Sequence, residues 1–444
     1  MALTSLPILL YVIPAVMLLT ALVPPRRKTA VLGLGGLAYA YFAAGGVGFS
    51  LLVLSVSGAW LTLRLMHTEE KVKRRCGVIC GVIWQIALLV TARFGFQLPA
   101  ADMLPLLLCA MLGTECVLER AKGRMFVPPL LAYLSGACAM PHLWAGPLME
   151  FPAMRRMTEQ RSVTAEKIGQ GAAKCITGLF QMVLLSVPLQ TLLTEIGSYA
   201  DTLSLFDAWL LLLIRYCAVW HWFCGAVRLG EGLALMLGYQ HPESVRHTVG
   251  AGSLREFCER FCGAVTEWTR RTVLGGADSL PSGTYFLRMA LLLCVTGWLL
   301  CGTLGAVVCG FFAAAILTLS RVPSLRRQLD TVPLFLRQVG TALLVLLLGG
   351  MPFCTGYTEL LRLHMALFGA NGTPLSQTVG YLCGTHFLPL FFAVLLLFPI
   401  APLIEKYAAE KKTAARILAV CKPVAELGIL LCCMAELLSQ YLRG

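Results

Sequence analysis

The fold of this chain is decided around residues 140 to 151, which read M-P-H-L-W-A-G-P-L-M-E-F. Pro141, Gly146 and Pro147 interrupt a helix here, because proline lacks a backbone donor and clashes with the preceding turn. Strongly apolar stretches lie on both sides. A break at membrane depth has to be buried in protein, since lipid offers no partners for the freed backbone groups. The segment therefore predicts an interior position among membrane helices.

The composition predicts an integral membrane protein. Hydrophobic residues make up 58% of the chain, charged residues 13%, and the mean hydropathy is +0.76, whereas a soluble domain has about a quarter charged residues. The net charge is +13, but Lys and Arg gather in short loops. This pattern indicates membrane topology rather than a nucleic-acid partner. The 18 cysteines are scattered through apolar runs without a C-x-x-C pair, so we expect neither a disulfide framework nor a metal site.

The apolar stretches predict an all-α, polytopic protein with about eleven transmembrane helices in a single domain over residues 1–444. Basic loops at residues 26–28, 71–75 and 120–124 belong on the cytoplasmic side, which places the N-terminus outside. The stretches that carry this interpretation are Ser5–Val23, Ala30–Ala44, Val47–Met66, Cys76–Ala92, Leu104–Leu118, Ala173–Leu193, Leu203–Ile214, Tyr216–Tyr239, Met289–Leu319 as a hairpin, Val332–Pro352, Phe387–Pro402 and Ile417–Leu438.

Two segments predict helices at the membrane interface instead. Residues 154–167 are polar and mixed in charge. Residues 253–271 begin with a capping box, Ser253 and Glu256, and place apolar side chains on one face at helical spacing. Arg255 and Glu259 are four residues apart on the other face and should pair.

Three motifs, in this order, resemble the membrane-bound O-acyltransferase family. In the first, Pro141, Ala145, Gly146 and Pro147 match F-P-x-x-x-A-G-P-I-x-R-Y. The second, residues 223–243, reads F-C-G-A-V-R-L-G-E-G-L-A-L-M-L-G-Y-Q-H-P-E, and the third, residues 253–271, reads S-L-R-E-F-C-E-R-F-C-G-A-V-T-E-W-T-R-R. The resemblance covers roughly residues 30–350. It is most like the bacterial branch that acylates polysaccharides and teichoic acids outside the cell.

This resemblance implies a ring of tilted helices around a tunnel. It also implies transfer of a small, acetyl-like group to hydroxyls of an extracytoplasmic glycan. No cofactor is expected to stay bound, and an acyl thioester is a suitable donor. The expected partners are the lipid bilayer, the acyl donor and a separate periplasmic or extracellular acyltransferase. The expected location is the bacterial plasma membrane.

Within the motifs, Gly225 and Trp268 match family positions, and the polar positions differ. Arg228 stands where the family has Asp, and Cys262 where it has His. The catalytic G-L-W-H-G of the family aligns with residues 297–302, G-W-L-L-C-G, in which Leu300 or Cys301 takes the place of His.

A base is needed because a neutral hydroxyl is a poor nucleophile, and removing its proton during attack contributes about 10²- to 10⁴-fold. Imidazole suits this task near neutral pH, whereas a buried thiol does not. His142 and His221 are therefore the candidate catalytic residues. Both stand beside tryptophans, so a structural role in an interfacial belt is the competing interpretation. Arg228 either pairs with Glu231 or Glu150, or extends its side chain to the interface.

Two hypotheses remain from the sequence. The chain is either an acyltransferase with a relocated histidine base, or a catalytically degenerate relative that serves a separate transferase as acyl conduit or envelope scaffold. A transporter is a weaker third reading, because no inverted repeat is detectable.

Overall fold

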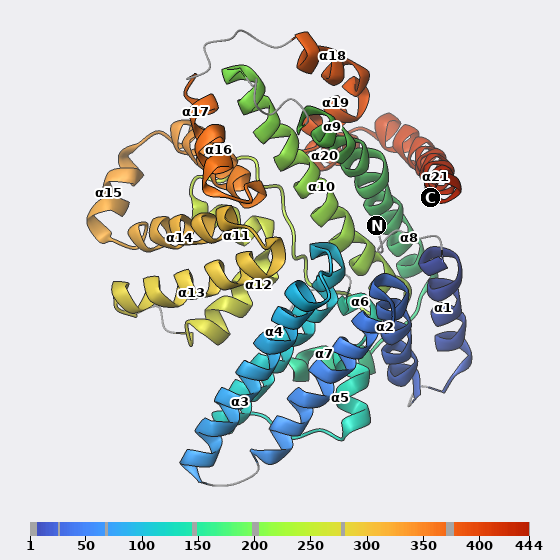
Figure 1. Ribbon diagram of the computed structural model, residues 1–444. Coiled ribbons are helices and arrows are strands. Elements are labelled where there is room, and N and C mark those ends of the chain that lie inside the picture. The colour runs from blue at the N-terminus through green and yellow to red at the C-terminus, as the bar shows by residue number, and fades with distance from the viewer. Residues whose placement is uncertain are drawn as a thin grey trace. The chain divides into compact units, whose positions relative to one another are not determined.

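The computed structural model describes residues 7–24, 27–66, 70–143, 149–197, 204–276, 280–369 and 377–443. These residues form helices and connecting loops, with no strand among them, which confirms the all-α fold (Figure 1). Contacts divide the chain into two compact units. Unit 1 contains Met1–Cys175, Ala226–Glu243 and Leu437–Gly444, and unit 2 contains Ile176–Gly225 and Ser244–Glu436. The prediction of a single domain stays a prediction.

The N-terminal helices make up most of unit 1. They are η2 (Ile8–Val12), α1 (Ile13–Leu22), α2 (Lys28–Leu65), α3 (Lys71–Val90), η4 (Thr91–Gly95), α4 (Ala100–Ala121), α5 (Leu130–Ala137), α6 (Met140–Leu143), α7 (Phe151–Glu159), most of α8 (Ala165–Leu179) and the end of α10 (Leu205–Met236).

Helix α2 is the centre of unit 1, and α3, α4 and α5 pack along it (Figure 1). Small residues allow the close approach: a Cβ on Gly33 would lie 2.7 Å from Ser135 Cα, and one on Gly36 would lie 1.6 Å from Cys138 O. Small residues at helix contacts are usual in membranes, where van der Waals packing replaces the hydrophobic drive. Helices α2 and α3 are also joined by a buried hydrogen bond of 2.6 Å from Ser55 Oγ to Gln85 Oε1.

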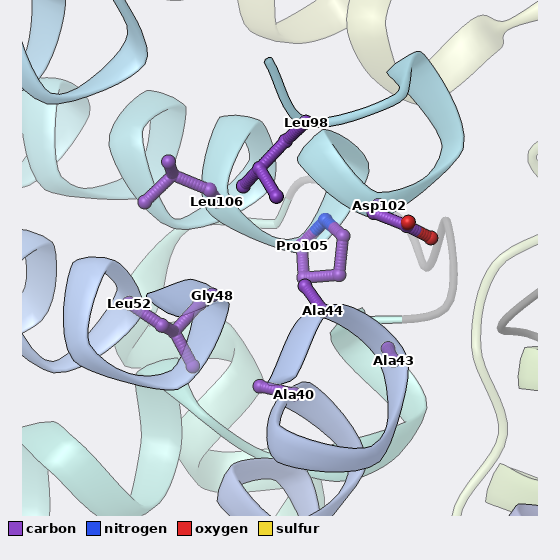
Figure 2. A pocket seen from close by; sticks show the side chains of 9 residues that line it. All are labelled: Ala40, Ala43, Ala44, Gly48, Leu52, Leu98, Asp102, Pro105 and Leu106. Carbon is purple, nitrogen blue, oxygen red and sulfur yellow. The ribbon is translucent and has the colours of Figure 1, made fainter. Parts of the chain in front are cut away.

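The apolar stretches Ala30–Ala44 and Val47–Met66, predicted as separate spans, form one helix, α2, with a kink between them. Gly45 has φ 64° and ψ −166°, a conformation that glycine adopts readily. A small apolar cavity lies at this kink, where α2 faces the start of α4 (Figure 2). It is lined by Ala40, Ala43, Ala44, Gly48, Leu52, Leu98, Asp102, Pro105 and Leu106. Pro105 lies inside α4, so the cavity sits where two irregular helices meet.

The later helices make up unit 2 together with most of α10 and the end of α8. They are η5 (Phe180–Ser186), α9 (Val187–Gly197), α11 (Leu254–Phe261), α12 (Gly263–Trp268), η7 (Thr269–Val273), α13 (Ser282–Cys301), α14 (Leu304–Leu319), α15 (Pro323–Thr331), α16 (Leu334–Gly350), η8 (Met351–Phe353), α17 (Tyr357–Leu367), α18 (Gln377–Thr385), α19 (Phe387–Leu395), α20 (Ile400–Glu410) and most of α21 (Lys412–Arg443).

Several predicted boundaries in this unit are confirmed. The hairpin predicted over residues 289–319 is formed by α13 and α14, which lie side by side (Figure 1). Gly302 makes the turn with φ 70°, and Thr303 Oγ1 caps α14 by accepting a hydrogen bond of 3.2 Å from Ala306 N. The Ser253 half of the predicted capping box is present, because Ser253 Oγ accepts a hydrogen bond of 3.2 Å from Glu256 N. The Glu256 carboxylate accepts from Gly252 N at 2.8 Å instead of from Ser253 N. Arg255 and Glu259 pair at 3.0 Å.

Other boundaries were wrong. The two stretches around residue 215 form one helix, α10, because the Arg215 guanidinium lies over the Phe353 ring at 5.0 Å and need not leave the helix packing. The stretch 387–402 is broken, since α19 ends at Leu395 and α20 begins at Ile400. The polar stretch 154–167 is not one helix either, because α7 ends at Glu159 and α8 begins at Ala165.

Within the described residues, seven helices are long and apolar enough to cross a membrane. Two bent pairs, α14 with α15 and α18 with α19, would raise the number to nine. The chain is a polytopic membrane protein by this measure, and the count of about eleven spans stays a prediction.

Candidate functional site: a buried histidine pair in unit 1

His142 lies in α6, a single helical turn that follows α5 after two residues and packs against α2 and α4. Its side chain is 8% exposed. Pro141 precedes it and is also buried. The predicted motif residues Ala145, Gly146 and Pro147 lie outside the described residues. The first motif therefore contributes a buried imidazole to the interior of unit 1, as the sequence indicated.

A glycine turn brings two further side chains to His142. After α10 ends at Met236, Gly238 adopts φ 97°, and a Cβ there would lie 2.9 Å from Ser162 C. Only glycine fits this turn without strain or displacement of a neighbour. The chain then continues through Tyr239 to His241, which are 3% and 4% exposed.

The three rings of this turn and of α6 pack together. The His142 and His241 ring centroids are 4.6 Å apart with the planes at 75°. Tyr239 lies 5.3 Å from His241 and 6.2 Å from His142, centroid to centroid. Edge-to-face packing of this kind is favourable between aromatic rings. We call His142, Tyr239, His241 and Arg161 the histidine cluster.

Arg161 joins the cluster because its backbone is tied to the same turn. Ser162 N donates to Gly238 O at 3.0 Å. Lys167 Nζ donates to Gly238 O at 3.1 Å and to Ser162 O at 2.9 Å. Arg161 directly precedes Ser162 in the loop between α7 and α8, and Tyr239 directly follows Gly238. The backbone hydrogen bond between Ser162 and Gly238 therefore brings the backbones of Arg161 and Tyr239 close together. The positive charge of Arg161 opposes the rise in the pKa of the Tyr239 hydroxyl.

The polar atoms of the histidine cluster are buried without protein partners. Among the described residues, none donates to or accepts from either ring nitrogen of His142 or His241, the Tyr239 hydroxyl, or the two terminal nitrogens of Arg161. Each such atom costs about 1–3 kcal/mol when it is left unpaired. Buried polar atoms are nearly always satisfied in native proteins. A group of seven at one place is therefore the pattern of a site for a polar ligand.

Burial also sets the protonation states of the cluster, whose members lie outside the membrane-spanning helices. Burial lowers the pKa of His142 to about 4. The pKa of His241 lies well below its ordinary value, first because of burial and then because of His142 and Lys174. Burial raises the pKa of Tyr239, although Arg161 opposes the shift. At neutral pH both imidazoles are neutral and the phenol is protonated.

The loop and the turn are held in place by a tight crossing of α8 and α10 within unit 1. A Cβ on Gly171 would lie 2.5 Å from Gly232 O, and one on Gly232 would lie 2.6 Å from Gly171 O. The helices therefore touch backbone to backbone. Beside this crossing, Lys174 Nζ pairs with Glu231 Oε2 at 3.0 Å, and the Glu231 side chain is 9% exposed. Glu231 is thus the partner of Lys174. Arg228 is half-buried, and no ion pair to it is found among the described residues.

His221, the second predicted candidate, has a structural role in unit 2. Its Nε2 donates to Ala393 O at 2.8 Å, so Nδ1 is the unprotonated nitrogen and lies 3.5 Å from Gln181 Nε2. The ring is fully buried and ties α10 to α19. Since both nitrogens have partners, this imidazole is not available to accept a substrate proton.

Three other predicted site residues, Cys262, Cys301 and Trp268, each lie at the end of a helix. Cys262 does not continue a helix, because its φ of −147° and ψ of 68° separate α11 from α12, and Gly263 N donates to Ser244 O at 2.9 Å. Burial raises the pKa of Cys262 to about 12, so the thiol is no base. Cys301 ends α13. Trp268 ends α12 and is buried.

Gly225 is a packing residue, since a Cβ there would lie 2.5 Å from Met182 Cγ and 2.7 Å from Gly178 O. Sequence reasoning missed three members of the histidine cluster: Arg161, Tyr239 and His241. The available signal was L-G-Y followed by H-P-E, a turn glycine between polar rings.

No family model matches the chain. Curated proteins do match. A probable alginate O-acetylase AlgI of Pseudomonas syringae pv. tomato is 26% identical over 168 residues, which are 36% of this chain and 32% of the relative. The same protein of Azotobacter vinelandii is 25% identical over 159 residues, 35% of this chain and 32% of the relative. That of Pseudomonas aeruginosa is 26% identical over 168 residues, with coverage of 36% and 32%.

The chain is similar to probable alginate O-acetylases. This confirms the resemblance drawn from the three motifs, to a membrane-bound O-acyltransferase. The matched part spans about a third of the length of these O-acetylases.

Proposed function

We propose that this protein transfers a small acyl group, acetyl-like in size, to a hydroxyl of an extracytoplasmic glycan, and that the histidine cluster is its catalytic site. The observation that carries the proposal is the buried His142–His241 pair with every ring nitrogen unpartnered among the described residues. Two features support it further: the relatives are named as alginate O-acetylases, and His142 lies in the first family motif.

The proposed step needs one base and one hydrogen-bond donor. The neutral His142 imidazole accepts the proton of the glycan hydroxyl. At the same time, the oxygen of that hydroxyl attacks the carbonyl carbon of an acyl thioester. The Tyr239 hydroxyl donates to the oxygen on which negative charge develops. The carbon–sulfur bond then breaks, and the leaving thiolate takes the proton from the imidazolium. An ester and a free thiol result.

His142 is the better base of the pair, because the pKa of His241 is lowered by Lys174 in addition to burial. His241 shapes the site by edge-to-face packing on His142. The base thus lies in the first motif rather than at residues 300–301, where the family keeps its histidine.

The setting of this reaction is part of the proposal. We place the protein in the bacterial plasma membrane with the N-terminus outside, in agreement with the basic loops, and expect a separate periplasmic or extracellular acyltransferase as a partner. The alternative is a degenerate relative that serves that partner as acyl conduit or scaffold.

The test is the amount of base-labile acyl ester on the envelope glycan, normalised to the amount of protein in the membrane. Cells lacking the protein are compared with cells restored with the wild type, His142→Ala, His241→Ala or His386→Ala. His386 serves as a matched control because it is half-buried at the start of α19, with Nδ1 3.2 Å from Leu382 O of the preceding helix. We expect ester to disappear on deletion and with His142→Ala, and to persist with His386→Ala. If ester persists with both His142→Ala and His241→Ala, the result would favour the acyl conduit over a catalyst with a histidine base.

A further inference from the structure

We infer that the histidine cluster binds an oxoanion of the substrate, a carboxylate or a phosphate, through the Arg161 guanidinium. This rests on the proposed function, since it assigns a substrate class to the same site. The placement puts an acidic group beside the base rather than in the membrane tunnel that the resemblance implies.

Arg161 supplies the geometry. Its two terminal nitrogens are buried and have no hydrogen-bond partner among the described residues. No ion pair to Arg161 is found there either. A guanidinium presents its donors as a planar fork that fits the two oxygens of a carboxylate or phosphate. A buried fork without a protein carboxylate is thus suited to a carboxylate or phosphate from the ligand.

The charges around the site point the same way. Lys174 and Glu231 compensate each other. The imidazoles are neutral at pH 7, and the Tyr239 phenol is protonated, so Arg161 contributes a positive charge that no carboxylate among the described residues pairs. A buried charge is stable only when it is paired. A ligand with one negative charge would balance the cluster.

An anion at this place would also strengthen the base. Burial alone holds the pKa of His142 down, because an imidazolium is poorly solvated there. A negative charge within a few ångströms favours the imidazolium and raises that pKa. His142 and Tyr239 pack against His241, and the charge of Lys174 acts on it. Arg161 acts on Tyr239, and Glu231 is paired with Lys174. Binding of an anion should therefore take up a proton.

Two sources share this ligand chemistry. One is an acidic sugar, whose carboxylate would sit on Arg161 while a ring hydroxyl meets His142. The other is a phosphate, on the acceptor polymer or on the carrier of the acyl thioester. The two are distinguished by glucuronate and inorganic phosphate as ligands, with glucose as the neutral control.

The experiment is isothermal titration calorimetry with the full-length protein in a neutral detergent. We expect glucuronate, phosphate or both to bind, and glucose not to bind. Arg161→Gln should raise the Kd by about 10- to 100-fold, the usual effect of losing charged hydrogen bonds. Arg161→Lys, which keeps the charge without the fork, should fall in between. Arg156→Gln removes an exposed arginine of α7 and should leave the Kd unchanged.

Proton uptake is measured with glucuronate, whose own carboxylate does not titrate near neutral pH, in two buffers of different ionisation enthalpy. We expect uptake of up to about one proton per ligand at pH 6, less at pH 8, and none in His142→Ala with His241→Ala. Variants with unchanged far-ultraviolet circular dichroism are compared, so that unfolding does not imitate lost binding.

The inference is overturned if neither anion binds, or if Arg161→Gln binds as tightly as the wild type. The proposed function fails separately. If an anion binds through Arg161 while His142→Ala still forms ester, the binding site stands and the catalytic role falls. If His142→Ala abolishes ester and no anion binds, only the present inference falls.

Discussion

Replacement of Gly238 by alanine should remove the histidine cluster without touching any of its side chains. Gly238 has φ 97°, and an added Cβ would lie 2.9 Å from Ser162 C, a backbone atom that cannot rotate away. A left-handed backbone costs a non-glycine residue about 1–2 kcal/mol, and overpacking costs about 1–3 kcal/mol. We therefore expect Gly238→Ala to lower the free energy of unfolding by about 2–5 kcal/mol.

Gly123 provides the matched control in the same unit. It follows α4 with φ 75°, and nothing lies within 4 Å of an added Cβ. Gly123→Ala should therefore lose only the backbone contribution, about 1–2 kcal/mol. The difference between the two variants isolates the contact between Gly238 and Ser162.

The assay has two readouts: unfolding in a titration from mild detergent into sodium dodecyl sulfate, and ester formation per folded protein. Gly238→Ala can relieve its contact only by moving Ser162, and Arg161 moves with it. Ester formation should then fall at least tenfold, whereas Gly123→Ala should retain it. Equal destabilisation of the two variants, or full ester formation by Gly238→Ala, would refute this account of the turn.

Further predictions concern single side chains. His142→Ala should reduce acyl transfer by about 10²- to 10⁴-fold with little change in stability, measured as ester formed per folded protein. His221→Ala should leave Ala393 O unpaired and lower the free energy of unfolding by about 1–3 kcal/mol, with unchanged transfer by the protein that remains folded; lost transfer would give His221 a catalytic role. Glu231→Gln should cost at most about 1 kcal/mol, because Lys174 is 36% exposed and partly screened; a larger loss of stability would show that the pair fixes the helix crossing. In pH profiles, kcat/KM should stay level down to pH 5 and fall near pH 4, since only neutral His142 accepts the proton and its pKa is about 4; a fall centred near pH 6.5 would mean that the imidazole is not buried. The same lowered pKa should make unfolding easier as the pH falls from about 6.5 towards 4, since the unfolded chain then binds a proton that the folded chain does not.

Local rules located those parts of the fold that depend on neighbouring residues. The kink at Gly45 and the Ser253 half of the capping box follow from the conformations that single residues prefer, and both are present. The break at Cys262 was missed because it is set by a distant residue, through the hydrogen bond from Gly263 N to Ser244 O. Arg215 misled in the opposite direction: in the sequence it ends an apolar run, but the Phe353 ring accommodates it within α10.

The site divides in the same way. His142 could be named from the sequence because it stands in a motif, but nothing local separates it from His221. The two histidines differ in their tertiary surroundings. Ala393 O accepts a hydrogen bond from the ring of His221, whereas no described residue forms a hydrogen bond with the ring of His142. Arg161 and Tyr239 are 78 positions apart in the chain and meet through one backbone hydrogen bond, from Ser162 N to Gly238 O. The proximity of two such distant residues produces no periodic pattern in the sequence, so it could not be predicted from a single sequence.

The histidine cluster also constrains which acceptor would make it a good catalyst. A base whose pKa is held near 4 by burial is always unprotonated at neutral pH, but it accepts a proton reluctantly. A neutral glycan would leave this penalty in the transition state. An acceptor that brings its own negative charge to Arg161 would raise the pKa of the base on binding, so part of its binding energy would appear as rate. The pH at which kcat falls should then lie above the pH at which kcat/KM falls, because only the complex contains the anion. Coinciding profiles would mean that the acceptor's charge, if it has one, does not reach His142.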